Sequence, residues 1–162
     1  MKSILGGFAA IGFAILFNVP KRLLLHIFVM GAIALFIKST CLDFFHINII
    51  FTSFLSSSTI GVIGLLVSRY KRTPPLILAI PSVIPLVPGI FIYNTLIGLM
   101  KMASESDNGF YDLFIQTTHN GLKATFILMV LAIGVAIPNL LLRQQSFYEG
   151  TEKRKIRWKR RF

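Results

Sequence analysis

Five apolar runs, separated by short polar stretches, make up most of this 162-residue chain. An α-helix needs about 20 mainly apolar residues to cross a hydrocarbon core of about 30 Å. We therefore expect an all-α integral membrane protein in which residues 1–142 form one transmembrane domain of five helices. The first run is short and the second contains Lys38, so four spans with one tilted or interfacial helix is the alternative. The five runs are residues 4–19, 23–42, 47–67, 76–100 and 122–142.

The basic residues gather on one side of this arrangement. The formal net charge is +11, with 17 Lys and Arg residues against 6 Asp and Glu residues. Most of the Lys and Arg residues follow the first, third or fifth run, and these three positions lie on the same side of the membrane. The positive-inside rule then places the N-terminus outside and the C-terminus in the cytoplasm. The charge therefore indicates membrane orientation, and we expect no nucleic-acid partner.

Residues 143–162 form a basic tail on the predicted cytoplasmic side. Anionic lipid headgroups attract such segments by about 1 kcal/mol per basic residue. We therefore expect the tail to anchor to lipid, with RNA or an acidic partner as the alternative target. The basic residues that would contact lipid headgroups are Lys153, Arg154, Lys155, Arg157, Lys159, Arg160 and Arg161.

The fourth run is interrupted by Pro81, Pro85, Pro88 and Gly89. A proline inside a helix lacks the N–H that would bond to the carbonyl four residues earlier. In lipid, such breaks are tolerated only where other groups satisfy the freed backbone, and transporters place broken helices near the membrane midplane. We therefore predict that the fourth helix is broken and that the break is functional.

After Pro88 and Gly89 the chain can resume as a half-helix, because proline suits the first helical turn. A helix N-terminus carries unpaired N–H donors and a partial positive charge, which together favour a carboxylate. Tyr93 and Asn94 add side-chain donors just beyond it. We expect a substrate path at Pro85, Pro88, Gly89, Tyr93 and Asn94. A kinked structural helix, with Asn94 bonded to a neighbour, is the alternative.

Weaker candidates for the same path are Asn18, Ser56, Ser57 and Thr59. The three hydroxyls belong to a dense polar cluster in the third run, and Asn18 lies just before Pro20. Hydroxyls in membrane helices often bond to their own backbone, and asparagine suits a helix end. Backbone bonding and capping are therefore the alternatives to a hydrated path.

Small residues recur at four-residue spacing in the first and third runs. Small side chains let membrane helices approach closely and gain van der Waals contact. We expect these stripes to pack within the subunit, with an intersubunit face as the alternative. The stripes are Gly6, Ala10 and Ala14, and Ser53, Ser57 and Gly61.

Residue types that carry enzymatic chemistry are sparse in the apolar runs. All six carboxylates fall outside the runs, so an acid for proton coupling would have to come from another subunit. The single cysteine, Cys41, excludes an intrachain disulfide and a cysteine-built metal site. The chain also lacks a phosphate-binding Gly-x-x-x-x-Gly-Lys-Ser/Thr loop. We therefore expect no enzymatic activity, no cofactor and no metal.

Two segments resemble the threonine/serine exporter family, and in particular its free-standing small subunit, the YjjB type. They are GFAILFNVP at residues 12–20 and IPLVPGIFIY at residues 84–93. The resemblance implies a two-component bacterial inner-membrane exporter, in which a larger YjjP-type membrane subunit pairs with the small one. It implies succinate as the cargo of the split pair, and threonine or serine for fused relatives.

We therefore expect a multi-pass subunit of an exporter of small carboxylate metabolites, with succinate as the first cargo and threonine or serine as the second. The basic tail departs from the family pattern. A non-transporting membrane scaffold, which would use that tail to hold lipid or protein, is the alternative from a different class.

Overall fold

The computed structural model describes residues 2–45, 48–104 and 110–159, with side chains described from Ser3 through Leu140 within these ranges. The described residues form helices joined by short turns and contain no strand, which confirms the expected all-α class. The elements are α1 (Lys2–Leu16), α2 (Lys21–Asp43), α3 (Ile49–Lys71), α4 (Pro75–Val83), the 3₁₀ turn η1 (Ile84–Leu86), α5 (Gly89–Ser104) and α6 (Phe110–Lys159).

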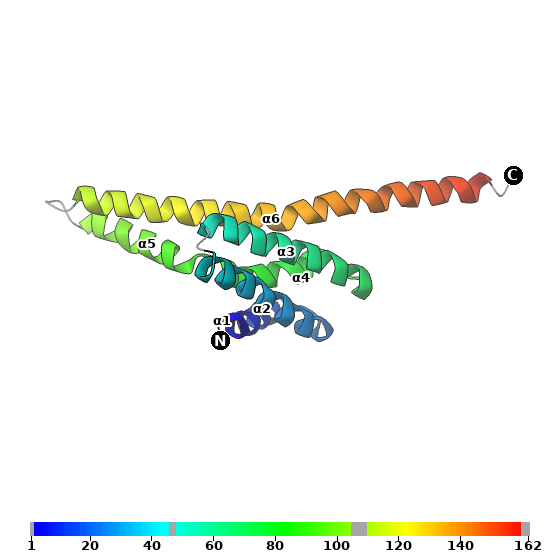
Figure 1. Ribbon diagram of the computed structural model, residues 1–162, viewed down its shortest axis with the longest axis horizontal. Coiled ribbons are helices and arrows are strands. Elements are labelled where there is room, and N and C mark those ends of the chain that lie inside the picture. Colours follow the sequence, from blue (N-terminus) through cyan, green and yellow to red (C-terminus); the bar gives the residue numbers. More distant parts are fainter. Residues whose placement is uncertain (1, 46–47, 105–109, 160–162) are drawn as a thin grey trace.

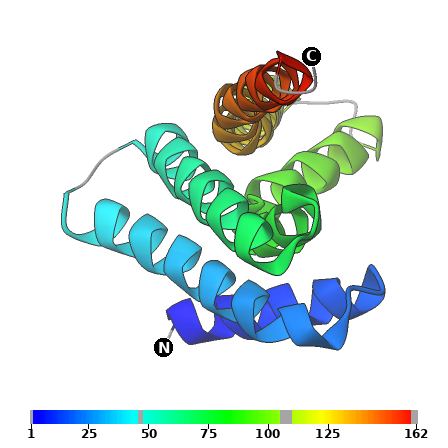
Figure 2. The same ribbon diagram turned by 90° about the vertical axis from the view of Figure 1, so that its right-hand side faces the viewer.

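The helices are arranged in layers. In Figure 2, α1 and α2 lie side by side beneath α3 and α4, and α6 runs above them. The core between these layers is made of buried apolar side chains, including Ala10, Ile27, Met30, Ile60 and Leu78. Figure 1 shows α5 and the first part of α6 side by side, extending on the left beyond the other helices.

Among the described residues, three helices are long and apolar enough to cross a membrane, namely α2, α3 and residues 110–140 of α6. The segments Pro75–Leu86 and Gly89–Ser104 pass the same test as one span bent by 59°. The described chain therefore offers up to four full spans. The remaining apolar helix, α1, has 15 residues and a length of about 22 Å, which makes it the short helix that the sequence singled out.

Asn18 explains why α1 ends before the first apolar run does. Its φ of 54° is left-handed, a conformation that asparagine tolerates better than most residues. The N–H of Val19 bonds to the carbonyl of Ala14 at 2.9 Å, and the N–H of Asn18 bonds to that of Ile15 at 3.0 Å. This is the hydrogen-bond pattern of a Schellman helix end, so Asn18 has the capping role that was the alternative to a path residue.

Both small-residue stripes lie inside the subunit. Gly31 of α2 sits against Ala10 of α1, where an added Cβ would approach the Ala10 Cβ to 2.6 Å. Gly61 of α3 faces the Pro138 ring and the carbonyl of Val135 in α6, at 3.0 and 3.1 Å from an added Cβ. The packing of α1 on α2 and of α3 on α6 therefore follows the expectation of contacts within one chain.

The helices extend beyond the apolar runs. α5 continues to Ser104 and α6 begins at Phe110, so most of the polar stretch between the fourth and fifth runs is helical. Gly98 of α5 packs directly against the side chain of Thr117 of α6, and this contact joins the two helices into a hairpin. The backbone of the predicted tail also continues α6, as helix, to Lys159.

Candidate functional site

The predicted break in the fourth helix is confirmed, and it lies at Val87. This residue has φ −56° and ψ 134°, because the ring of the following Pro88 disfavours a helical conformation at the preceding residue. Pro81 lies inside α4, and Pro85 is accommodated in the 3₁₀ turn η1. The chain therefore changes direction across Val87 and Pro88, whereas Pro81 and Pro85 remain within helical turns.

The position of the break agrees with a site near the membrane midplane. The twelve residues of α4 and η1 extend about 18 Å, at about 1.5 Å per residue. A hydrocarbon core is about 30 Å thick. A span that starts at Pro75 therefore reaches the break a little beyond half of that thickness.

The first turn of α5 satisfies several of its own N–H groups. The N–H of Gly89 bonds to the carbonyl of Val87 at 2.9 Å, and those of Phe91 and Ile92 bond to the carbonyl of Pro88 at 3.1 and 3.2 Å. Donors expected to face a substrate are thus engaged within the chain. An anion at this break needs positive charge from another element.

Lys38 of α2 supplies a positive charge at the break. Its Nζ donates a hydrogen bond of 2.8 Å to the carbonyl of Leu86, and Leu86 is fully buried. In an unbroken helix that carbonyl would accept the N–H of Ile90, so Lys38 replaces the missing helical bond. Nothing in the sequence pattern pairs Lys38 with Leu86, although an ionisable residue inside a membrane helix is itself a signal of function.

The residues predicted after the break lie on an open surface. Gly89 is exposed, and a Cβ added there would meet no atom within 4 Å. Tyr93 is 63% exposed and Asn94 is also exposed. Within the described residues, no side-chain hydrogen bond fixes Tyr93 or Asn94. The side chain of Asn94 is therefore free to meet a substrate or another subunit.

The three α3 hydroxyls that were candidates for the path bond to their own helix. Ser56 Oγ donates to the Thr52 carbonyl at 2.9 Å, and Ser57 Oγ donates to the Phe54 carbonyl at 3.0 Å. Thr59 Oγ1 likewise bonds to a carbonyl of its own helix at 2.8 Å. Ser56 and Ser57 are fully buried. This is the backbone bonding that was the alternative to a hydrated path.

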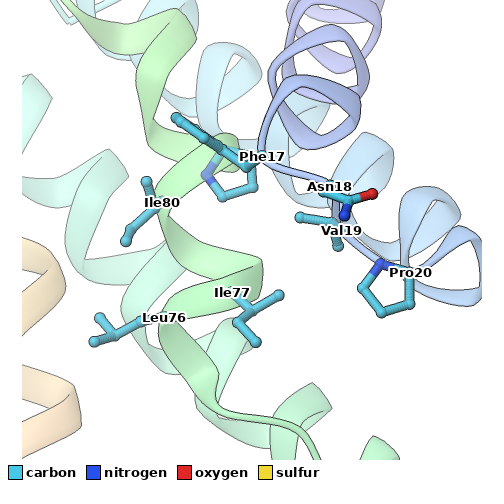
Figure 3. Close-up of a pocket in the computed structure, with 8 residues that line it drawn as sticks. Phe17, Asn18, Val19, Pro20, Leu76, Ile77 and Ile80 are labelled. Atoms are coloured by element: carbon cyan, nitrogen blue, oxygen red, sulfur yellow. The ribbon is translucent and has the colours of Figure 1, made fainter.

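Asn18 lines a separate hollow, shown in Figure 3, of about 310 Å³. The hollow lies between the α1–α2 turn and the first two turns of α4, and its walls are otherwise apolar. The structure therefore does not bring Asn18 to the Val87–Gly89 break. The lining residues are Phe17, Asn18, Val19, Pro20, Leu76, Ile77, Ile80 and Pro81.

The tail residues expected to contact lipid are only partly covered by the structure. The α6 backbone includes Lys153, Arg154, Lys155, Arg157 and Lys159. Arg160 and Arg161 lie outside the described residues. Lipid anchoring by this tail remains a prediction.

Comparison with known proteins places the chain in a family. Residues 2–141, which include the break and the membrane part of α6, match a family model described as "Threonine/Serine exporter, ThrE". An uncharacterized protein of Haemophilus influenzae is 31% identical over 140 residues, a match that covers 85% of this chain and 45% of that protein. The chain thus spans less than half the length of that relative. No solved structure matches this chain. On the family match, which covers nearly the whole chain, this protein belongs to the threonine/serine exporter family.

Proposed function

We propose that this chain is the small subunit of a two-component exporter of small carboxylate metabolites in a bacterial inner membrane, with succinate as the preferred cargo. The observation that carries the proposal is the broken fourth helix, whose freed Leu86 carbonyl is bonded to a lysine from α2. Family membership supports export as the activity. A cation at a helix break inside the membrane suits a cargo with a carboxylate.

Two observations support a larger partner subunit, which we propose is of the YjjP type. The Haemophilus relative has 55% of its length outside the matched region, enough for a second component in the same chain. Within the described helices, α5 packs extensively only against α6. Its exposed side chains include Ile90, Tyr93, Leu96, Leu99 and Met100, and these would be available to a partner as well as to lipid.

The break offers a hinge for alternating access, without covalent chemistry. α4 packs against α1, α2 and α3, whereas α5 packs against α6. α6 in turn packs closely against α3. A change in the Val87 dihedral angles would therefore move α5 relative to α4, while α6 stays on α3. In this proposal Pro85 and Pro88 shape the hinge, and Gly89, Tyr93 and Asn94 face the cargo or the partner.

Deletion of either subunit is expected to abolish export. The test is efflux of labelled succinate and threonine from cells lacking this chain, the larger subunit or both, each with the missing gene restored. We expect selective loss of succinate efflux in all three deletions, with recovery only when both genes are present. Unchanged efflux of both cargos in the double deletion would reject the proposal.

Threonine or serine is the second candidate cargo, because the family model is described by these amino acids. The same deletions distinguish the two cases. Selective loss of threonine efflux would assign the amino acid cargo and exclude succinate. Both cargos carry a carboxylate, so the geometry at the break is compatible with each of them.

Truncation after residue 142 is expected to leave export largely intact. The tail lies beyond the membrane part of α6, and the transmembrane helices hold the protein in the bilayer far more firmly than a basic segment does. The measurement is succinate efflux and co-purification of the larger subunit, compared between the full chain and residues 1–142. If the larger subunit no longer co-purifies but succinate efflux is unchanged, the result would instead favour the alternative of a non-transporting membrane scaffold.

A further inference from the structure

Two lysines from different helices flank the broken segment. Lys38 of α2 bonds through Nζ to the Leu86 carbonyl at 2.8 Å, immediately before the break. Lys123 of α6 places its Nζ 5.6 Å from the centre of the Phe91 ring, in the first turn of α5. Leu86 and Phe91 enclose only the short segment of residues 87–90. The fold therefore brings two positive charges to the two sides of one helix break.

Among the described residues, Lys38 contacts a backbone carbonyl and Lys123 contacts an aromatic ring. In the described parts of the candidate spans, carboxylates occur only at the ends, as Asp43 and Asp112. A lysine inside a span is unfavourable, by about 2.5–3.5 kcal/mol at the helix centre and by less toward its ends, so a bound anion would stabilise both lysines. A carbonyl and an aromatic ring provide partial compensation through a dipole and a cation–π contact.

Both ammonium groups also keep spare hydrogen-bond donors. A lysine ammonium has three donors, and Lys38 uses one of them on Leu86. The contact of Lys123 with Phe91 uses the ring face and no acceptor atom. Gly89, which lies between Leu86 and Phe91 in the chain, is exposed, and a Cβ added there would meet no atom within 4 Å. The break thus combines two lysines that keep free donors with a backbone position that is open on its outer side.

We propose that Lys38 and Lys123 together form the carboxylate-binding element of the transport path and favour a dicarboxylate over a zwitterionic amino acid. This inference rests on the proposed export function. A dicarboxylate presents one anionic group to each lysine. An amino acid presents one carboxylate, and its ammonium group is repelled by the second lysine. Binding also draws Lys38 away from the Leu86 carbonyl, which releases the contact between α2 and the hinge.

The test uses proteoliposomes that contain the full chain and its larger subunit, with labelled succinate and threonine as cargos. Lys38→Met and Lys123→Met should each lower succinate transport about tenfold or more, because removing one member of a charge pair is costly. Threonine transport should change much less. Lys38→Arg and Lys123→Arg should keep the succinate preference. Lys101→Met, at an exposed lysine in the last turn of α5, is the matched control.

The ratio of succinate transport to threonine transport distinguishes charge recognition by the two lysines from a structural role. A structural role would lower succinate and threonine transport equally, and this result would overturn the proposal. Unchanged succinate preference in both Met variants would overturn it as well, while leaving the export function in place. If the wild-type complex transports neither cargo, the export function fails and the lysine site fails with it. Transport of threonine alone by the wild type would reject only the dicarboxylate preference.

Discussion

Gly134→Leu is expected to force α6 away from α3 and to destabilise the fold. A Cβ added at Gly134 would meet the Ser57 hydroxyl directly and would lie 3.2 Å from the Phe54 carbonyl. The backbone carbonyl is part of α3, so it can move only if the whole helix moves. Overpacking of this kind costs about 3 kcal/mol in a tightly packed core.

The measurement is thermal unfolding of the purified protein in detergent. We expect a lower unfolding midpoint and a lower yield of monodisperse protein for Gly134→Leu. Gly12→Leu is the matched control, because a Cβ added at Gly12 of α1 meets no atom within 4 Å. Equal midpoints for wild type and Gly134→Leu would mean that α3 and α6 are not in close contact.

Gly89→Leu is expected to abolish export while leaving membrane insertion and stability intact. A Cβ added at Gly89 meets no atom of this chain within 4 Å, and the backbone there has no positive φ. Leucine is also a better helix former than glycine, by about 1 kcal/mol. The added bulk therefore acts only on the outer side of the break, where the cargo or the partner would approach.

The measurement pairs succinate efflux with the amount of protein in the membrane and its unfolding midpoint. Loss of efflux at normal protein amount and midpoint would assign Gly89 to the transport path. Gly12→Leu again serves as the control and should export normally. Wild-type efflux from Gly89→Leu would count against the path at this break.

The parts of the fold that depend on local patterns were predictable from the sequence. The apolar runs indicated membrane helices, and the proline-rich segment indicated a broken one. The spacing of small residues indicated close helix packing within the subunit, although it did not indicate which helices would pair. Each of these signals acts within one helix, where residue type and spacing decide the conformation.

Other features depend on contacts between distant segments. Whether a proline ends a helix was not predictable residue by residue: Pro81 stays within α4, while Val87 leaves the helical conformation before Pro88. The start of α6 lies outside the fifth apolar run, and Thr117 in this extension packs against Gly98 of α5. The bond from Lys38 to Leu86 joins residues 48 positions apart, so it arises only once α2 packs against η1.

Transport by purified components tests the central claim most directly. Proteoliposomes loaded with unlabelled succinate would be prepared with this chain, with the larger subunit, with both, or with neither, and the exchange of external labelled succinate would be followed over time. We predict rapid exchange only when both subunits are present. Equal exchange in all four preparations, or full exchange with one subunit alone, would contradict a two-subunit carboxylate exporter.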